Sequence, residues 1–192
     1  MALNFIETSI KDCFIIEPQV FGDERGFFME TYSEKDFLAQ GIDIRFVQDN
    51  HSKSKKWVFR GFHFQTQNTQ TKLVRVISGS VLDFAIDIRK DSATYGKYVM
   101  VELSEKNKRQ FLVPQGFAHG FLTLEDNTEF VYKCDNFYSP EFDAGISYDD
   151  ESLWIDWCEL RARYGLRIEE LLVSEKDKKH PTLQEFHSCN PF

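Results

Sequence analysis

The stretch VLDFAIDI at residues 81–88 carries the pattern that decides the fold. Its even-numbered positions are all large and apolar, whereas its odd-numbered positions include two aspartates, Asp83 and Asp87. Strict alternation predicts a β-strand, because successive side chains of a strand point to opposite faces of the sheet. The two carboxylates therefore share one face, where they belong either to a solvated edge or to the lining of a polar cavity.

Short runs of similar character, separated by turns, fill most of the chain. Their nearly regular spacing predicts a mostly β sandwich or barrel. A short helix is expected at 33–40, with Ser33 as its N-cap, and helical patterns return at 159–164 and 182–186. The predicted strands cover 14–21, 27–32, 44–48, 57–65, 72–78, 81–88, 98–103, 110–113, 117–124 and 128–134.

The length and composition set limits on the class of protein. A chain of 192 residues suits one domain, and its 19 phenylalanines favour a β-rich interior. We expect extended N-terminal strands over 1–50, a barrel core at about 44–148 and a helical appendage at about 156–192. The net charge of −8 argues against a sequence-independent nucleic-acid binder. Without a signal-peptide pattern or a membrane-length apolar stretch, we expect a soluble cytoplasmic protein.

The four cysteines, Cys13, Cys134, Cys158 and Cys189, are widely scattered and form no CxxC pair. This spacing excludes metal-finger and redox motifs. We interpret the cysteines as free thiols in a reducing compartment.

The apolar strand predicted at 57–65 contains two unusual polar residues, Arg60 and His63. In perfect alternation they point to opposite faces, but Gly61 between them is a natural site for a β-bulge, which would bring both onto one face. The polar segment 48–56 before this strand is expected to be a loop. A structural histidine beside a surface arginine is the alternative interpretation.

Three other polar side chains fall on apolar strand faces: Lys72, His119 and Tyr132. Lys72 stands at the start of its strand, so a solvated lysine is also possible. Together with His63 they form a set able to move protons, because histidine can act as a general base, lysine can stabilise an enolate oxygen and tyrosine can return a proton. The sequence contains no glycine-rich phosphate loop and no GxSxG nucleophile elbow.

The segment PQGFAHGF at 114–121 resembles the second motif of cupins, which are small β-barrels. The corresponding first motif normally supplies His-x-His and a downstream glutamate as metal ligands. In this chain the first motif is HFQ at 63–65, which lacks the second histidine. A metal would therefore have only two imidazoles as ligands, those of His63 and His119. We therefore predict no metal.

A combination of segments is similar to one family, dTDP-4-dehydrorhamnose 3,5-epimerase, over nearly all the chain to about residue 180. The segments are GDERGFF at 22–28, FVQDNHSKSK at 46–55, RGFHFQ at 60–65, KLVRV at 72–76, DIRKDS at 87–92, PQGFAHGF at 114–121, YKCDNFYSP at 132–140 and SEKD at 174–177.

The resemblance implies a mostly β, cupin-type double-stranded β-helix, or jelly-roll barrel, that is homodimeric and needs no cofactor. It also implies inversion of C3 and C5 of dTDP-4-dehydro-6-deoxy-D-glucose, giving dTDP-4-dehydro-L-rhamnose in dTDP-L-rhamnose biosynthesis. The hydrogens at C3 and C5 are on the carbons next to the C4 carbonyl, so removing either one as a proton yields an enolate. No nucleic-acid or membrane partner is expected.

In the family pattern, His63 matches the general base and Asp177 its carboxylate partner. Lys72 matches the residue that stabilises the enolate oxygen, and Tyr132 matches the acid that reprotonates the opposite face. Arg25, Phe28 and Glu30 match residues that bind the nucleotide, with the base contact coming from the partner subunit. All the positions that match substrate-binding residues are Arg25, Phe28, Glu30, Gln48, Asp49, Asn50, Arg60, His119, Tyr138, Asp143 and Lys176.

Three departures and several alternatives accompany this resemblance. Asp143 stands where the family commonly has glutamate, Cys158 follows Trp157 where proline is usual, and the tail at 178–192 matches nothing in the pattern. The nearest alternative function is a mono-epimerase that acts at C3 or C5 of a dTDP-4-keto sugar, depending on how Tyr138 sets the sugar. The other alternative functions, in decreasing order, are a ketoisomerase of related fold, a non-catalytic sugar-binding cupin and a metal-dependent cupin.

Overall fold

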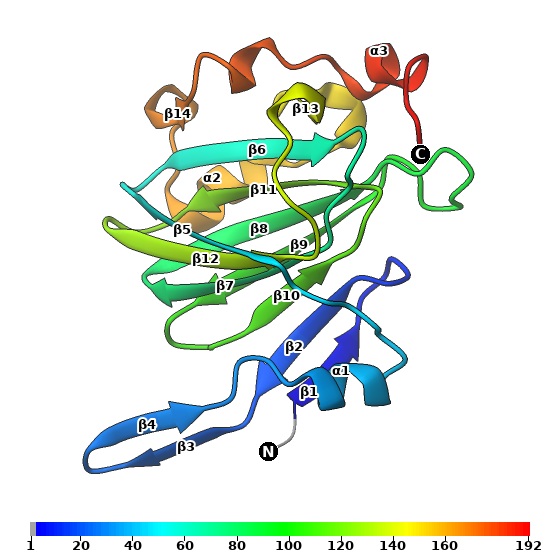
Figure 1. Ribbon diagram of the computed structural model, residues 1–192. Coiled ribbons are helices and arrows are strands. Elements are labelled where there is room, and N and C mark those ends of the chain that lie inside the picture. Colours follow the sequence, from blue (N-terminus) through cyan, green and yellow to red (C-terminus); the bar gives the residue numbers. More distant parts are fainter. Residues whose placement is uncertain (1–2) are drawn as a thin grey trace.

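Two facing antiparallel sheets form most of the computed structural model, which describes residues 3–192, so the first two residues of the expected N-terminal segment lie outside it (Figure 1). Within that range the strands are β1 (Leu3–Glu7), β2 (Phe14–Pro18), β3 (Val20–Asp23), β4 (Gly26–Met29), β5 (Gln48–Ser54), β6 (Val58–Gln65), β7 (Lys72–Ser78), β8 (Ser80–Asp87), β9 (Tyr98–Ser104), β10 (Gln110–Val113), β11 (Phe117–Thr123), β12 (Thr128–Cys134), β13 (Asp143–Gly145) and β14 (Leu172–Val173).

The strand order of the first sheet is β1-β2-β10-β7-β12-β5, and that of the second is β13-β6-β11-β8-β9, with β14 added in parallel beside β6. The strands of each sheet come from distant parts of the chain, so that β10 lies between β2 and β7. This is the jelly-roll barrel of a cupin, and the predicted fold class is confirmed.

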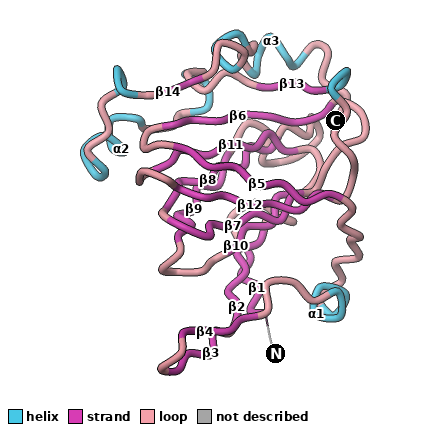
Figure 2. Tube along the Cα trace, turned by 60° about the vertical axis from the view of Figure 1, so that its left-hand side comes forward, coloured by secondary structure: helices cyan, strands magenta, loops and turns pink. Residues whose placement is uncertain are grey.

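Three apolar layers stabilise the barrel, and each explains an alternating sequence pattern. Side chains from both sheets, such as Val74 and Phe121, fill the space between them. The outer face of the second sheet, including Phe84, packs under the helices α2 (Trp157–Tyr164) and α3 (Leu183–His187). The outer face of the first sheet packs against α1 (Glu34–Ala39). Figure 2 shows α1 on one side of the molecule and the C-terminal helices on the other.

The helix α1 begins where its capping residue predicts. The Ser33 hydroxyl accepts a hydrogen bond from the backbone N–H of Asp36 at 3.3 Å, which confirms the predicted N-cap of α1. None of the helices among residues 3–192 combines the length and apolar character needed to cross a membrane.

The β8 strand resolves the two interpretations of its aspartates. Asp83 and Asp87 are both fully buried, so a solvated edge is wrong. Asp83 bonds to His119 inside the barrel at 2.9 Å. Asp87 accepts hydrogen bonds from Arg89, Ser92 and other donors in the following loop. Both carboxylates are therefore buried hydrogen-bond acceptors, one paired with a histidine inside the barrel and the other with the loop after β8, rather than groups that line an open cavity.

The polar segment that begins at Gln48 is a strand, and its prediction as a loop was wrong. β5 forms the edge of the first sheet and pairs along its whole length with β12. Gln48 and Asn50 are half-buried on one face, while Asp49 and His51 are exposed on the other. Neither face of this edge strand is apolar, so the alternation that identifies a strand is hidden. The predicted strand at 44–48 does not form, and β1, β13 and β14 were not predicted.

A hairpin made of β3 and β4 extends away from the barrel (Figure 1). It carries exposed apolar side chains at Val20, Phe21, Phe27 and Phe28. Its turn holds Arg25, whose guanidinium bonds to Asp23.

Candidate active site

A pocket of about 390 Å³ is lined by residues of both sheets and of the segments that follow them. Eight residues that the sequence singled out line it: Gln48, Asn50, His63, Lys72, Tyr132, Tyr138, Asp143 and Lys176. Phe64, Gln65 and Gln70 complete the lining.

His63 reaches this pocket because of an irregularity in β6. The pairing of β6 with β11 shifts register between His63 and Arg60, where Gly61 lies. Phe59 and Phe62, although three residues apart, pack edge to face at 5.1 Å in the same outer layer. Because these two rings share the outer face, the residues next to them, Arg60 and His63, share the opposite one. The predicted bulge at Gly61 is confirmed.

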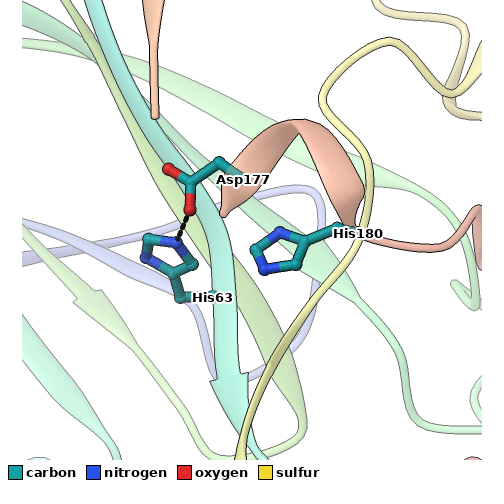
Figure 3. Close-up of side chains that lie close together, drawn as sticks. All are labelled: His63, Asp177 and His180. Atoms are coloured by element: carbon teal, nitrogen blue, oxygen red, sulfur yellow. Dashed lines mark hydrogen bonds and ion pairs between the residues drawn. The ribbon is translucent and has the colours of Figure 1, made fainter. Parts of the chain in front are cut away.

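His63 and Asp177 form a hydrogen-bonded pair. Nε2 of His63 lies 2.8 Å from Oδ1 of Asp177, whose side chain is almost fully buried (Figure 3). Burial alone would raise the pKa of Asp177, but the bond from His63 and a backbone bond from Gly61 outweigh it and hold that pKa below its usual value. An ionised Asp177 that accepts from Nε2–H leaves the Nδ1 lone pair of His63 available to take a proton.

Lys72 and Tyr132 enter the pocket from the first sheet. Lys72 Nζ lies 3.5 Å from the carbonyl oxygen of His63, and burial lowers the pKa of Lys72 below its ordinary value. Burial, with a contribution from Cys134, raises the pKa of Tyr132 to about 12, so its phenol keeps its proton at neutral pH. The solvated-lysine interpretation of Lys72 is therefore wrong.

The exposed ring of Tyr138 is held at the pocket by three contacts. Its hydroxyl donates to Asp143 Oδ2 at 2.9 Å, and its backbone N–H donates to Gln48 Oε1 at 2.9 Å. The next backbone N–H, that of Ser139, donates to Gln65 Oε1 at 2.8 Å. Asp143 also pairs with Lys176. The shorter side chain of Asp143 therefore still joins Tyr138 to Lys176.

Three of the predicted sugar-contacting and diphosphate-contacting residues, Arg60, His119 and Asp49, lie outside this lining. Arg60 donates from Nε to Ser54 at 3.3 Å, on the side of the pocket toward β5. His119 is buried and bonded to Asp83, with Lys72 beside it along a narrow crevice. Asp49 lies on the other face of β5 from Gln48 and pairs with Lys133 at 2.9 Å.

The predicted nucleotide residues Arg25, Phe28 and Glu30 lie on or next to the β3–β4 hairpin, away from the pocket of their own chain (Figure 1). Arg25 and Phe28 are largely exposed.

Sequence reasoning missed His180 and Gly145, which lie beside His63. The rings of His63 and His180 meet edge to face at 5.5 Å, and Gly145 is the Cα partner of His63 across β13 and β6. Burial, with the neighbouring His63, lowers the pKa of His180. The spacing of His180 three residues after Asp177 was the available signal, but it lies in the tail that matched no known pattern.

Comparison with known proteins gives consistent results. A family model described as dTDP-4-dehydrorhamnose 3,5-epimerase matches residues 7–185. The chain is 49% identical over 183 residues to the dTDP-4-dehydrorhamnose 3,5-epimerase of Methanothermobacter thermautotrophicus, covering 95% of each chain.

Solved structures agree with this match. The dTDP-6-deoxy-D-glucose-3,5-epimerase of Legionella pneumophila in complex with dTDP-4-keto-L-rhamnose is similar with a TM-score of 0.88 at 47% identity, over 95% of this chain and 93% of that one. A 3'-monoepimerase from Streptomyces bikiniensis in complex with dTDP-quinovose has a TM-score of 0.86 at 27% identity, over 96% and 90% of the two chains.

Proposed function

This chain belongs to the dTDP-4-dehydrorhamnose 3,5-epimerase family and is an epimerase of the isomerase class, and we propose that His63, Lys72 and Tyr132 carry out its chemistry. The substrate is dTDP-4-dehydro-6-deoxy-D-glucose, and inversion at C3 and C5 gives dTDP-4-dehydro-L-rhamnose. The hydrogens at both carbons are acidified by the C4 carbonyl, so each inversion can proceed through an enolate.

One observation carries the assignment of base and acid. His63 stands on β6 of the second sheet and Tyr132 on β12 of the first, yet both line the same pocket. A sugar ring bound between them presents one face to the imidazole and the other to the phenol. Loss of a proton to His63 and gain of a proton from Tyr132 on the opposite face inverts the carbon.

Two further groups support this chemistry. Lys72 lies near the His63 end of the pocket, where its Nζ can hydrogen-bond the oxygen of the enolate. Asp177 keeps the proton of His63 on Nε2 and stabilises the imidazolium after proton transfer. Both interactions are stronger in this partly buried pocket than they would be in bulk water.

The binding of the substrate is assigned to the remaining polar residues. Gln48, Asn50, Tyr138, Asp143 and Lys176 line the pocket and offer both donors and acceptors for sugar hydroxyls and phosphates. Arg60 and His119 lie beside it, and Asp49 is assigned to the same group from the family pattern. The acidic chain can still bind an anionic sugar nucleotide, because cationic side chains gather locally at the site.

We assign nucleotide binding to a homodimer in which Arg25, Phe28 and Glu30 serve the pocket of the partner. The β3–β4 hairpin supports this, because it extends from the barrel with Phe27 and Phe28 58% and 61% exposed. Exposed aromatic residues of this kind are typical of surfaces that become buried on association. We also propose that the chain forms a single domain and acts in the cytoplasm.

The test is incubation with dTDP-4-dehydro-6-deoxyglucose in D₂O, with deuterium at C3 and C5 followed by NMR. Label and inversion at both centres are expected for the wild type, and neither is expected for His63→Ala. A matched control is His187→Ala, since His187 is exposed and bonds to Tyr95 away from the pocket. If the wild type exchanges at neither carbon, the enolate mechanism is wrong.

The second candidate is a mono-epimerase, favoured by the similarity to the 3'-monoepimerase of Streptomyces bikiniensis. The same experiment separates the two, because a mono-epimerase inverts and labels one carbon only. The higher identity to 3,5-epimerases favours inversion of both.

A further inference from the structure

His180 is a histidine without a hydrogen-bond partner beside the proposed catalytic pair. Neither of its ring nitrogens bonds to any of the residues 3–192, although both atoms are buried. The ring stands at 90° to that of His63 (Figure 3). Buried polar atoms are normally satisfied, so this imidazole requires an explanation.

The position of the ring is fixed by the backbone on both sides. His180 ends a 3₁₀ turn that begins at Asp177, and its N–H donates to the Asp177 carbonyl at 3.3 Å. On the opposite side it packs against Gly145, where a Cβ would lie only 2.3 Å from the ring. Glycine at this position therefore makes the space that the imidazole occupies.

The three side chains form a set of possible metal ligands. One nitrogen from each of His63 and His180 and one carboxylate oxygen of Asp177 lie within 4.8 Å of one another. Tetrahedral zinc with bonds of about 2.0–2.2 Å needs its ligand atoms roughly 3.4 Å apart, so small side-chain rotations would bring them together. Two imidazoles and one carboxylate leave a fourth position for water or a substrate oxygen.

We propose that His63, Asp177 and His180 form a Zn²⁺ site that switches the enzyme off. Two imidazole nitrogens and a carboxylate oxygen favour zinc over the harder cations magnesium and calcium, which prefer oxygen ligands. The site differs from the metal site of cupins, because His119 is not part of it and bonds instead to Asp83.

Inhibition follows from which nitrogen of His63 the metal occupies. Zinc on Nδ1 takes the lone pair that would accept the substrate proton. Zinc on Nε2 displaces the hydrogen bond to Asp177 and leaves the ring proton on Nδ1. In both cases His63 can no longer act as a base. Zinc binding itself does not depend on the reaction, whereas inhibition rests on the proposed function.

The experiment measures zinc binding by calorimetry and activity in parallel. The wild type is expected to bind one equivalent of Zn²⁺ and to lose activity, which a chelator restores. His180→Phe keeps an aromatic ring against His63 but removes both nitrogens, and it is expected to retain basal activity while its zinc affinity falls at least about 100-fold. His180→Ala is the second variant, and His187→Ala, in the nearby helix α3, is the matched control with wild-type zinc binding.

Each outcome decides a separate question. Wild-type protein that takes up no zinc, or His180→Phe and His180→Ala proteins that bind it as tightly as wild type, would overturn the site. Zinc bound through His180 without loss of turnover would overturn the switch. A folded wild type that binds zinc but turns over no dTDP-4-keto sugar would count against the proposed function and leave the binding site supported.

Discussion

Asp177 lies 114 residues after His63 in the chain, and its carboxylate accepts a hydrogen bond from the imidazole at 2.8 Å. The bond joins β6 of the second sheet to a 3₁₀ turn near the C-terminus. It fixes which nitrogen of His63 carries the proton. The C-terminal segment therefore completes the site as well as covering the outer face of the second sheet.

Replacing the carboxylate tests this relationship. Asp177→Asn keeps the size of the side chain but can donate to Nε2, which favours the wrong tautomer of His63. We expect kcat to fall about 10²–10⁴-fold with a small change in KM. Asp43→Asn, a change at an exposed position, is the control and should leave kcat unchanged. A wild-type kcat in Asp177→Asn would show that the carboxylate does not orient the base.

The role of Tyr132 as acid gives a second prediction. Tyr132→Phe removes the phenolic proton but leaves His63 and Lys72 in place, so the enolate can still form and exchange. We expect deuterium at the reacting carbons to persist while the rate of inversion falls about 10²–10⁴-fold. NMR in D₂O measures both quantities. Tyr164→Phe, which removes a hydroxyl bonded to Glu102, is the control. Loss of exchange together with inversion would contradict the assignment.

The buried pair of Asp83 and His119 should contribute to stability. Their side chains are 0% and 7% exposed, and burial raises the pKa of Asp83. His119→Phe leaves Asp83 without its donor, and we expect the free energy of unfolding to fall by about 3–5 kcal/mol in urea titrations. Asp83→Asn combined with His119→Phe should be less destabilising than the sum of the single changes, by roughly 1–3 kcal/mol. Additive effects would mean that the two residues are not energetically coupled.

A fourth prediction concerns stability at low pH. Burial alone would raise the pKa of Asp87, but bonds from Arg89, Ser92 and Thr94 outweigh it and lower that pKa below 3.8. A lowered pKa in the folded state stabilises the protein above pH 3.8, and this contribution disappears as the pH falls through the folded-state value. Asp87→Asn should therefore be less stable than wild type at neutral pH, by about 1.5–3 kcal/mol for each charged hydrogen bond lost.

The measurement is chemical unfolding of both proteins at pH 7 and at successively lower pH. The difference in the free energy of unfolding should shrink below pH 3.8. Asp91→Asn, at an exposed position of the same loop, is the control and should show little difference at any pH. A constant difference over the whole range would mean that ionisation of Asp87 is not the cause.

Local pattern was sufficient for much of the barrel. The strands at 72–78, 110–113 and 128–134 were predicted with the bounds that the structure has, because short apolar runs and alternating runs are patterns of neighbouring residues that can be detected without the tertiary structure. The same alternation put Lys72 and Tyr132 on inward faces. It failed for β5, because a polar pocket on one side and solvent on the other leave no apolar face to detect.

The sequence by itself determined that this is a β-barrel of one enzyme family, and it named His63, Lys72 and Tyr132, since strand periodicity and family motifs are local properties. Tertiary structure alone decided that Asp83 is buried with His119 and that His180 fits against Gly145 beside His63. The physical reason is that these contacts join segments far apart in the chain. Their partners, burial and pKa shifts follow from sheet pairing and from the path of the C-terminal segment.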